Sequence, residues 1–256
     1  MHRFYLGTHK PVWLSRFDIP MFVSRNSLVT YKKLPRALGR WALDSGGFTE
    51  ISKYGRWRTD IETFIADVRR FRDEVGNMDW SACQDWMCEP HMLELTGGSV
   101  ESHQLMTTTN YIELRHRAPD IPWAPVLQGW GWGDHVRHAE LYKQHGVDLT
   151  KCPAVGIGSV CRRQGTTRGI LLITEIAEAL PGVRLHGFGF KTDGLLGLKE
   201  LPMDFPLYSS DSLAWSYSAR RAPPLPGCRH KSCSNCSRWA MNWRENLMNR
   251  MGEAHA

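Results

Sequence analysis

Short apolar runs that end in small or polar residues recur along the chain, and each is typical of a buried β-strand that reaches the surface at its end. The clearest example is Trp41-Ala42-Leu43, which is followed at once by the polar and glycine-rich stretch that runs from Asp44 to Phe48. The pattern predicts eight strands, in residues 4–8, 20–24, 41–45, 78–84, 125–129, 154–158, 184–189 and 206–210.

Segments with helical periodicity lie between several of these runs. In residues 60–75 the apolar side chains recur at the spacing of one helix face, and charged residues occupy the other positions. Pro181-Gly182 marks the end of another such segment. The pattern predicts helices in residues 60–75, 99–117, 134–145 and 166–180.

Strands that alternate with helices imply parallel pairing and an α/β fold. Eight such strands predict a closed (β/α)8 TIM barrel, a fold of about 250 residues, and the chain has 256. A doubly wound open sheet is the alternative. We assign the barrel to residues 1–222 and a small C-terminal element packed on it to residues 223–256.

The barrel interpretation places the carboxyl ends of all strands around one mouth, where the active sites of such barrels lie. Hydrogen-bonding residues close most of the predicted strands. Asp44 and Asp211 are the two acids that we expect to share a pocket. Taken singly, such an aspartate is more often a helix N-cap or turn residue than a catalytic one. The strand-closing residues are Asp44, Ser45, Asp85, Gln128, Gly129, Gly158, Ser159, His186 and Asp211.

Composition narrows the function classes only a little. Hydrophobic residues make up 42% and charged residues 23% of the chain, which is ordinary for a globular protein, and the formal net charge of +6 favours polyanionic partners. No apolar run approaches the roughly 20 residues needed to span a membrane, and the first residues lack the apolar core of a signal peptide. We therefore expect a cytoplasmic protein.

Three of the seven cysteines crowd near the end of the chain, in the pattern Cys228-x-His230-x2-Cys233-x2-Cys236. Three thiolates and an imidazole suit a tetrahedral zinc ion, and four protein ligands leave no open position, so the predicted zinc is structural. His255 is an alternative to His230 as the fourth ligand.

These motifs, in this order, resemble those of the guanine transglycosylases, which exchange guanine for a 7-deazaguanine. The resemblance rests on Asp44 to Phe48, Leu127-Gln128-Gly129, residues 157–160, residues 186–189, and Asp211-Ser212 followed by a zinc pattern. It covers residues 41 to about 239. The short chain and the compact zinc pattern look more like the phage and bacterial branch that inserts 7-deazaguanines into DNA (DpdA-like) than like the tRNA enzymes.

The resemblance implies a role for each site residue. Asp211 is the expected nucleophile towards C1′ and Asp44 the group that moves the proton. Asp85 is expected to accept hydrogen bonds from the Watson–Crick edge of guanine, although a helix N-cap is an equal alternative from the residues alone. The remaining pocket residues are Gln128 with the Gly158 amide towards O6 and N7, Ser45 in support, Phe48 and His186 stacked on the ring, and Gly129 and Ser159 beside them.

Phosphate contacts are expected from Arg162, Arg163 and Arg220, although a single arginine is more often a solvated charge. The expected partners are DNA and a 7-deazaguanine base of the 7-cyano (preQ0) type, with no nucleotide cofactor, and a homodimer is possible. Three other functions remain open: base exchange in tRNA, an inert zinc-containing nucleic-acid-binding module, and a barrel glycosidase that uses Asp44 and Asp211. For His186, a buried core histidine is the alternative.

Overall fold

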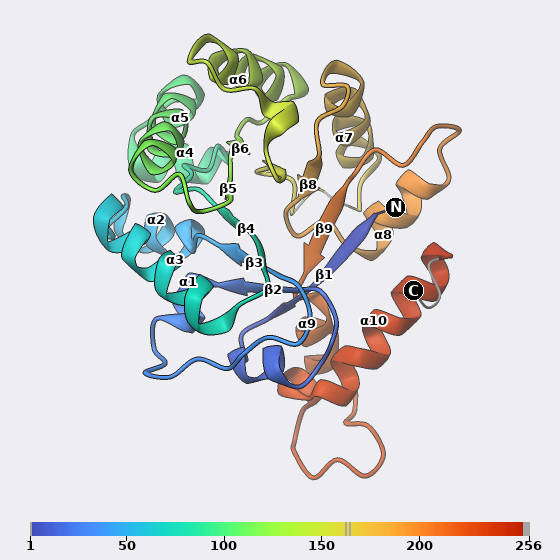
Figure 1. The fold of residues 1–256 in the computed structure, drawn as a ribbon. Helices are drawn as coiled ribbons and strands as arrows, with labels where there is room; N and C mark the ends of the chain where they lie inside the picture. Colours follow the sequence, from blue (N-terminus) through green and yellow to red (C-terminus); the bar gives the residue numbers. More distant parts are fainter. Residues whose placement is uncertain (1, 162, 164, 253–256) are drawn as a thin grey trace.

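The computed structural model describes residues 2–161, 163 and 165–252, and within them nine parallel strands form one sheet that curves around a central axis (Figure 1). Their order in the sheet is β5-β4-β3-β2-β1-β9-β8-β7-β6. The strands are β1 (Arg3–Thr8), β2 (Met21–Ser24), β3 (Trp41–Asp44), β4 (Met78–Ala82), β5 (Trp123–Ala124), β6 (Val126–Leu127), β7 (Val155–Ile157), β8 (Leu185–Gly187) and β9 (Ser209–Ser212).

The two ends of the sheet, β5 and β6, are consecutive segments that only Pro125 separates. β5 pairs with β4 and β6 pairs with β7, so the chain passes directly from one edge of the sheet to the other. Proline has no backbone N–H to donate, but the Pro125 carbonyl still accepts from the Gly156 amide at 2.9 Å. β5 and β6 together make the eighth strand of a nearly closed barrel. The predicted barrel is confirmed, and the open doubly wound sheet is not formed.

Helices surround the strands (Figure 1). The four predicted helices are confirmed as α3 (Ile61–Val75), α5 (Val100–Arg117), α6 (Trp132–Gln144) and α7 (Thr167–Ala179). In α3 the buried face predicted from periodicity is present, and the Asp60 side chain caps the helix by accepting from the Thr63 amide. The other helical segments are α1 (Arg25–Leu28), α2 (Gly47–Tyr54), α4 (Pro90–Thr96), α8 (Thr192–Lys199), α9 (Ala214–Arg220), α10 (Ser237–Met251), η1 (Pro11–Ser15), η2 (Leu149–Lys151) and η3 (Cys233–Asn235).

The alternation of side chains along each strand decides which residues point into the barrel. Trp41 and Leu43 belong to the core between the sheet and the helices, whereas Ala42 belongs to a second cluster inside the barrel with Tyr5 and Trp80. Because side chains two residues apart share a face, Asp44 follows Ala42 into the interior. By the same rule, the Asp211 side chain points into the barrel.

The C-terminal segment shares the barrel's outer core. Ala240, Leu247, Met248 and Met251 of α10 are buried in the same cluster as the strand residues, and the Trp243 ring lies 5.9 Å from the Phe4 ring. Among the residues that the structure describes, none of the helices combines the length and apolar character needed to cross a bilayer.

Candidate active site

A cavity of about 530 Å³ opens at the carboxyl ends of the strands. Eight of the site residues expected from the sequence line it: Asp44, Ser45, Phe48, Asp85, Gln128, Gly158, Ser159 and Asp211. Residues far apart along the chain therefore converge on one concave surface. Three of them carry carboxyl groups, and carboxyl groups gathered in one cavity are a common basis for acid–base and nucleophilic chemistry.

Neither Asp44 nor Asp211 caps the helix that follows it. The N-cap position of α2 is Gly46, and that of α9 is Leu213. Asp85 likewise precedes α4 by several residues, and the N-cap there is Glu89. Helix capping, the ordinary structural role for such acids, therefore accounts for none of the three.

Burial raises the pKa of Asp44 above its ordinary value, and the charge of Asp211 raises it further. Hydrogen bonds from the Ser24 hydroxyl and the Gly46 amide oppose this rise without cancelling it. The raised pKa has two physical causes, exclusion of water and a like charge nearby. Asp44 therefore retains a proton more readily than an exposed aspartate does.

Asp211 is 8% exposed and lies within β9, one residue from its end. Its Oδ1 accepts a hydrogen bond from the Gly189 amide at 2.8 Å. His186 Nε2 is 3.3 Å from the same oxygen but is not aligned as a hydrogen-bond donor. One oxygen of the carboxylate is thus held against the turn that follows β8.

Asp85 is the centre of a side-chain network on the cavity wall. Its Oδ2 accepts from Gln128 Nε2 at 2.6 Å, and its Oδ1 accepts from the Ser45 hydroxyl at 3.2 Å. Burial raises the pKa of Asp85 to about 7, and the charge of Asp44 contributes to this rise. Asp85 can therefore gain or lose its proton near neutral pH.

Ser159 continues this network from the loop after β7. Its Oγ lies 3.2 Å from Gln128 Oε1 and 3.0 Å from Glu89 Oε2, and it accepts from the Cys88 amide at 3.2 Å. Its φ of +58° is unusual for a residue other than glycine. Such a backbone persists only where the surroundings hold it.

Arg163 holds the Ser159 loop in place. Its Nε and Nη2 donate to the Ser159 carbonyl at 3.1 and 2.9 Å, and its Nη1 donates to the Trp130 carbonyl at 2.6 Å. The guanidinium also lies 4.0 Å from the centre of the Trp130 ring. These contacts give Arg163 a structural role in the loop that does not depend on a phosphate. Arg162 lies outside the described residues, and Arg220 is exposed in the last turn of α9.

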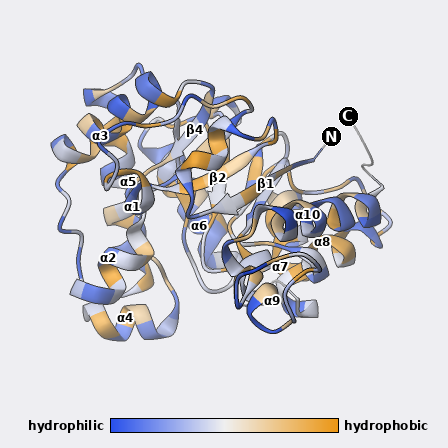
Figure 2. Cartoon of the chain, turned by 90° about the horizontal axis from the view of Figure 1, so that it is seen from below, coloured by the Kyte–Doolittle hydropathy of each residue, from blue (hydrophilic) through white to orange (hydrophobic). Residues whose placement is uncertain are grey.

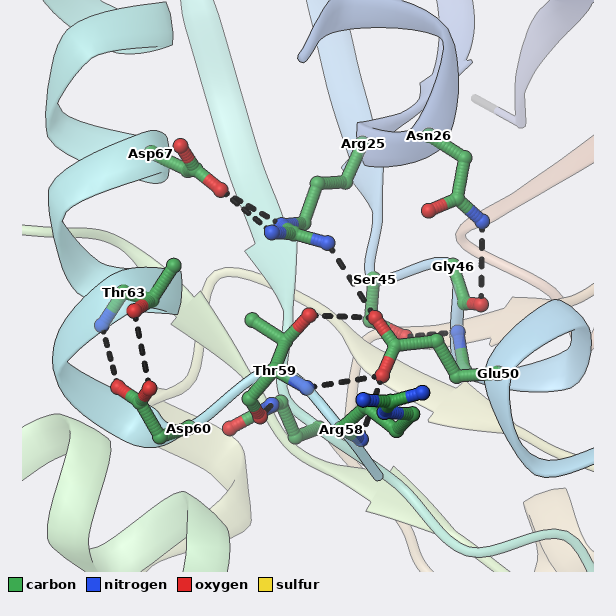
Figure 3. Close-up of polar contacts among 12 residues, drawn as sticks. Arg25, Asn26, Ser45, Gly46, Glu50, Arg58, Thr59, Asp60, Thr63 and Asp67 are labelled. Carbon is green, nitrogen blue, oxygen red and sulfur yellow. Dashed lines mark hydrogen bonds and ion pairs between the residues drawn. The ribbon is translucent and has the colours of Figure 1, made fainter. Parts of the chain in front are cut away.

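A network of polar contacts surrounds Glu50, outside the cavity lining (Figure 3). Glu50 accepts from the backbone amides of residues 58 and 59 at 2.7 and 2.9 Å, and Arg25 Nη1 lies 3.4 Å from it. The segment held in this way carries Trp57, whose indole N–H donates to the Asp85 carbonyl at 3.0 Å. No sequence motif links Glu50 to Asp85, so this arrangement could not be predicted from the sequence.

The geometry does not support two of the expected base contacts. His186 is fully buried among aromatic rings, with Trp80 at 4.7 Å and Phe188 at 4.9 Å, and its Nδ1 lies 2.9 Å from the Ser209 hydroxyl. It does not line the cavity, as the alternative of a core histidine predicts.

The second expected base contact is the one from the Gly158 amide. This amide donates its proton to the Leu127 carbonyl at 2.9 Å, so the proton is not available to a base. A Cβ on Gly158 would lie 2.4 Å from the Gln128 side chain, which explains a glycine there. Gly129 similarly allows close packing, because a Cβ on it would lie 2.5 Å from that of Asp134, and it does not line the cavity.

The comparisons with known proteins agree with this geometry. The sequence model of the family DpdA, "DeoxyPurine in DNA protein A", matches residues 1–255. The chain belongs to the DpdA family. Membership confirms the resemblance to DNA-guanine transglycosylases and gives the protein an enzymatic role in 7-deazaguanine modification of DNA. None of the curated proteins matches the chain.

Among solved structures, a putative fructose-1,6-biphosphate aldolase from Coccidioides immitis is similar, with a TM-score of 0.53 and 11% identity. The similarity covers 99% of this chain and 90% of that one. At this identity the likeness concerns the fold alone, because barrels of this kind support many unrelated reactions. The DpdA assignment therefore rests on the family match, and the barrel on the strand topology.

Several residues on the wall of this DpdA cavity were not expected from the sequence. They include polar side chains such as Thr8, Ser24 and Glu89 as well as apolar ones. Phe188, two residues beyond His186, lines the cavity, and His186 does not. The additional lining residues include Phe22, Met87, Glu89, Phe188 and Leu213.

The predicted zinc ligands come together in this DpdA protein. The Sγ atoms of Cys228, Cys233 and Cys236 and a ring nitrogen of His230 all lie within 4.8 Å of one another. Zinc–sulfur and zinc–nitrogen bonds of about 2.0–2.3 Å fit at the centre of such a set. The donor set therefore fits a structural zinc ion with all four positions filled by protein. His255 lies outside the described residues.

Hydrogen bonds join the cysteine cluster to α9 and to the mouth of the cavity. The Ser216 hydroxyl donates to the Ser234 carbonyl at 2.8 Å, and the Ser232 hydroxyl donates to the Ala219 carbonyl at 3.2 Å. Asn235 also hydrogen-bonds His9, which lines the cavity. These hydrogen bonds therefore fix the cysteine cluster against α9, the helix that follows Asp211.

Proposed function

We propose that the protein exchanges guanine in DNA for a 7-deazaguanine of the 7-cyano type, through a covalent bond between Asp211 and C1′ of the nucleotide. The observation that carries the proposal is the meeting of Asp44, Asp85 and Asp211 in one cavity with Gln128. Base exchange needs a nucleophile, a proton carrier and a group that recognises the base. The cavity offers one carboxyl group for each task.

In the first displacement an Asp211 oxygen attacks C1′ as the bond from C1′ to guanine N9 breaks. The electrons of that bond leave with the base, which takes one proton from Asp44. The products are an ester between Asp211 and the sugar, free guanine, and ionised Asp44. The raised pKa of Asp44 supports its role as the proton donor.

In the second displacement the incoming base loses its N9 proton to Asp44. Its N9 then attacks C1′, and the ester bond breaks to release the Asp211 carboxylate. The new glycosidic bond replaces the old one, and Asp44 is again protonated for the next cycle. The hydrogen bond from the Gly189 amide supports Asp211 as the leaving carboxylate.

Recognition of the base is assigned to Asp85, which as a carboxylate accepts from the N1–H and N2–H2 groups of guanine. The carboxamide of Gln128 already lies against Asp85 and, after it turns, is suited to donate to O6. Adenine would leave these buried groups unpaired, at a cost of about 1–3 kcal/mol each. Phe48 and Phe188, both on the cavity wall, are suited to hold the faces of the ring.

A guanine inside a duplex cannot enter such a cavity, so the nucleotide must be extruded or single-stranded. The test is incorporation of isotope-labelled 7-cyano-7-deazaguanine into plasmid DNA and into tRNA, followed by digestion and mass analysis of the nucleosides. We expect the label in DNA, and none with Asp85→Asn. Label only in tRNA would favour the tRNA reaction. DNA binding without any incorporation would favour an inert binding module.

A further inference from the structure

Helix α9 begins directly after the strand that carries Asp211, and its two faces differ in burial. Trp215 is fully buried and its indole N–H donates to the Gly7 carbonyl at 2.8 Å, which fixes the inner face to the barrel. On the outer side, Leu213 is 44% exposed and Tyr217 is 57% exposed. Two large apolar side chains therefore face solvent within six residues of the proposed nucleophile.

These side chains form a row that starts at the cavity wall. Leu213 lines the cavity, and Tyr217 and Arg221 follow it at intervals of four residues, the spacing that aligns side chains on one helix face. The Arg221 guanidinium lies 4.7 Å from the centre of the Tyr217 ring. We call these three residues the α9 row. Scattered exposed apolar residues need no explanation, but this row is continuous with the site.

Leu213 of the α9 row and Phe48 of α2 line the same cavity. Figure 2 shows α9 on one side of the molecule, with α2 and α4 on the other. A nucleotide in the cavity would therefore have its neighbouring bases and phosphates close to α9. The formal net charge of +6 of the whole chain favours a polyanionic partner.

We propose that the α9 row holds the DNA strand beside the extruded guanine, with Leu213 filling the gap that the base leaves in the stack. Apolar side chains fill such gaps in distorted duplexes, and aromatic rings stack on bases of any sequence. Tyr217 is placed to stack on a neighbouring base and Arg221 to contact a phosphate. The inference rests on the proposed function and adds duplex DNA as the substrate that the enzyme opens.

The test compares base exchange in duplex and in single-stranded DNA of the same sequence. The ratio of the duplex rate to the single-strand rate is expected to fall at least tenfold in Leu213→Ala, because only the duplex needs its gap filled. Leu213→Met, which restores apolar bulk, is expected to recover most of the ratio. Leu105→Ala, at a 51% exposed leucine on α5, is the matched control and keeps the wild-type ratio.

A ratio in Leu213→Ala within twofold of wild type would overturn the inference, and so would a wild-type enzyme that acts only on single strands. A second readout does not depend on base exchange. The fluorescence of 2-aminopurine placed beside the target guanine increases when the duplex is opened. The wild-type protein should increase this fluorescence, and Leu213→Ala should not. If no base is exchanged by any variant, the proposed function fails, and this signal still decides the role of Leu213.

Discussion

The amide of Gly189 donates a hydrogen bond to Oδ1 of Asp211 across 2.8 Å. Gly189 has a φ of +60°, and a Cβ there would lie 2.4 Å from the Cys161 thiol, so the position favours glycine. The bond joins the turn after β8 to the carboxylate on β9. The proposed nucleophile is therefore oriented by backbone, which does not reorganise as readily as a side chain.

Base affinity is expected to depend on pH through Asp85. Burial raises its pKa to about 7, and only the ionised carboxylate accepts both guanine donors. Affinity for free guanine should therefore be highest above pH 7 and should weaken below it, by up to about tenfold per pH unit. Calorimetric titration from pH 5.5 to 8.5 measures this.

Asp85→Asn should bind guanine weakly at every pH, while Asp148→Asn, a change in an exposed turn, should keep the wild-type profile. An affinity for guanine that is constant across this range in the wild-type protein would contradict the role of Asp85.

Arg163 and Arg220 are expected to respond differently to salt. The Arg163 guanidinium donates to the Ser159 and Trp130 carbonyls and so holds the cavity loop. Arg163→Ala should therefore slow base exchange and leave the salt dependence of DNA affinity unchanged. Arg220→Ala should make the slope of log K against log[salt] shallower by about 1, as expected for one lost phosphate contact. Fluorescence anisotropy at several salt concentrations measures both slopes.

Arg163→Lys should not restore the rate, because a single ammonium cannot bridge both carbonyls as the planar guanidinium does. A shallower salt dependence of DNA affinity in Arg163→Ala would instead indicate that Arg163 contacts a phosphate.

Loss of a zinc ligand is expected to destabilise the C-terminal part of the chain and α9 with it. Cys233→Ser should lower the metal content measured by mass spectrometry and lower the melting temperature by at least about 5 °C. Cys152→Ser, at a buried cysteine outside the cluster, should keep the metal. Full zinc occupancy in Cys233→Ser, or an unchanged melting temperature after chelation, would contradict a structural zinc at these residues.

The sequence predicted the parts of this protein that depend on local pattern. Short apolar runs that alternate with helical periodicity were enough to predict the barrel and helices α3, α5, α6 and α7, and the residues that close those runs include Asp44, Asp85 and Asp211. Helix α10, which is as long as α3, was not predicted. The cysteine cluster was visible because its ligands are close together in sequence. Short helices such as α4 and α9 have too few turns to show periodicity.

Contacts between distant segments were not predictable from these patterns. His186 occupies a strand end, as a ligand-binding residue would, but the rings of Trp80 and Phe188 enclose it. Arg163 follows the cavity loop, as a phosphate ligand would, but two carbonyl groups occupy it. In both cases the residue type is compatible with function, and only three-dimensional packing shows which groups surround the side chain.

The most direct measurement is a search for the covalent intermediate on Asp211. Protein, guanine-containing DNA and 7-cyano-7-deazaguanine are mixed, denatured and separated on a gel, and the retarded band is digested and mapped by mass spectrometry. We predict a DNA adduct on Asp211 in the wild-type protein and in Asp148→Asn, and none in Asp211→Asn. An adduct that maps to another residue, or an Asp211→Asn variant that exchanges base as fast as the wild-type protein, would contradict the proposed mechanism.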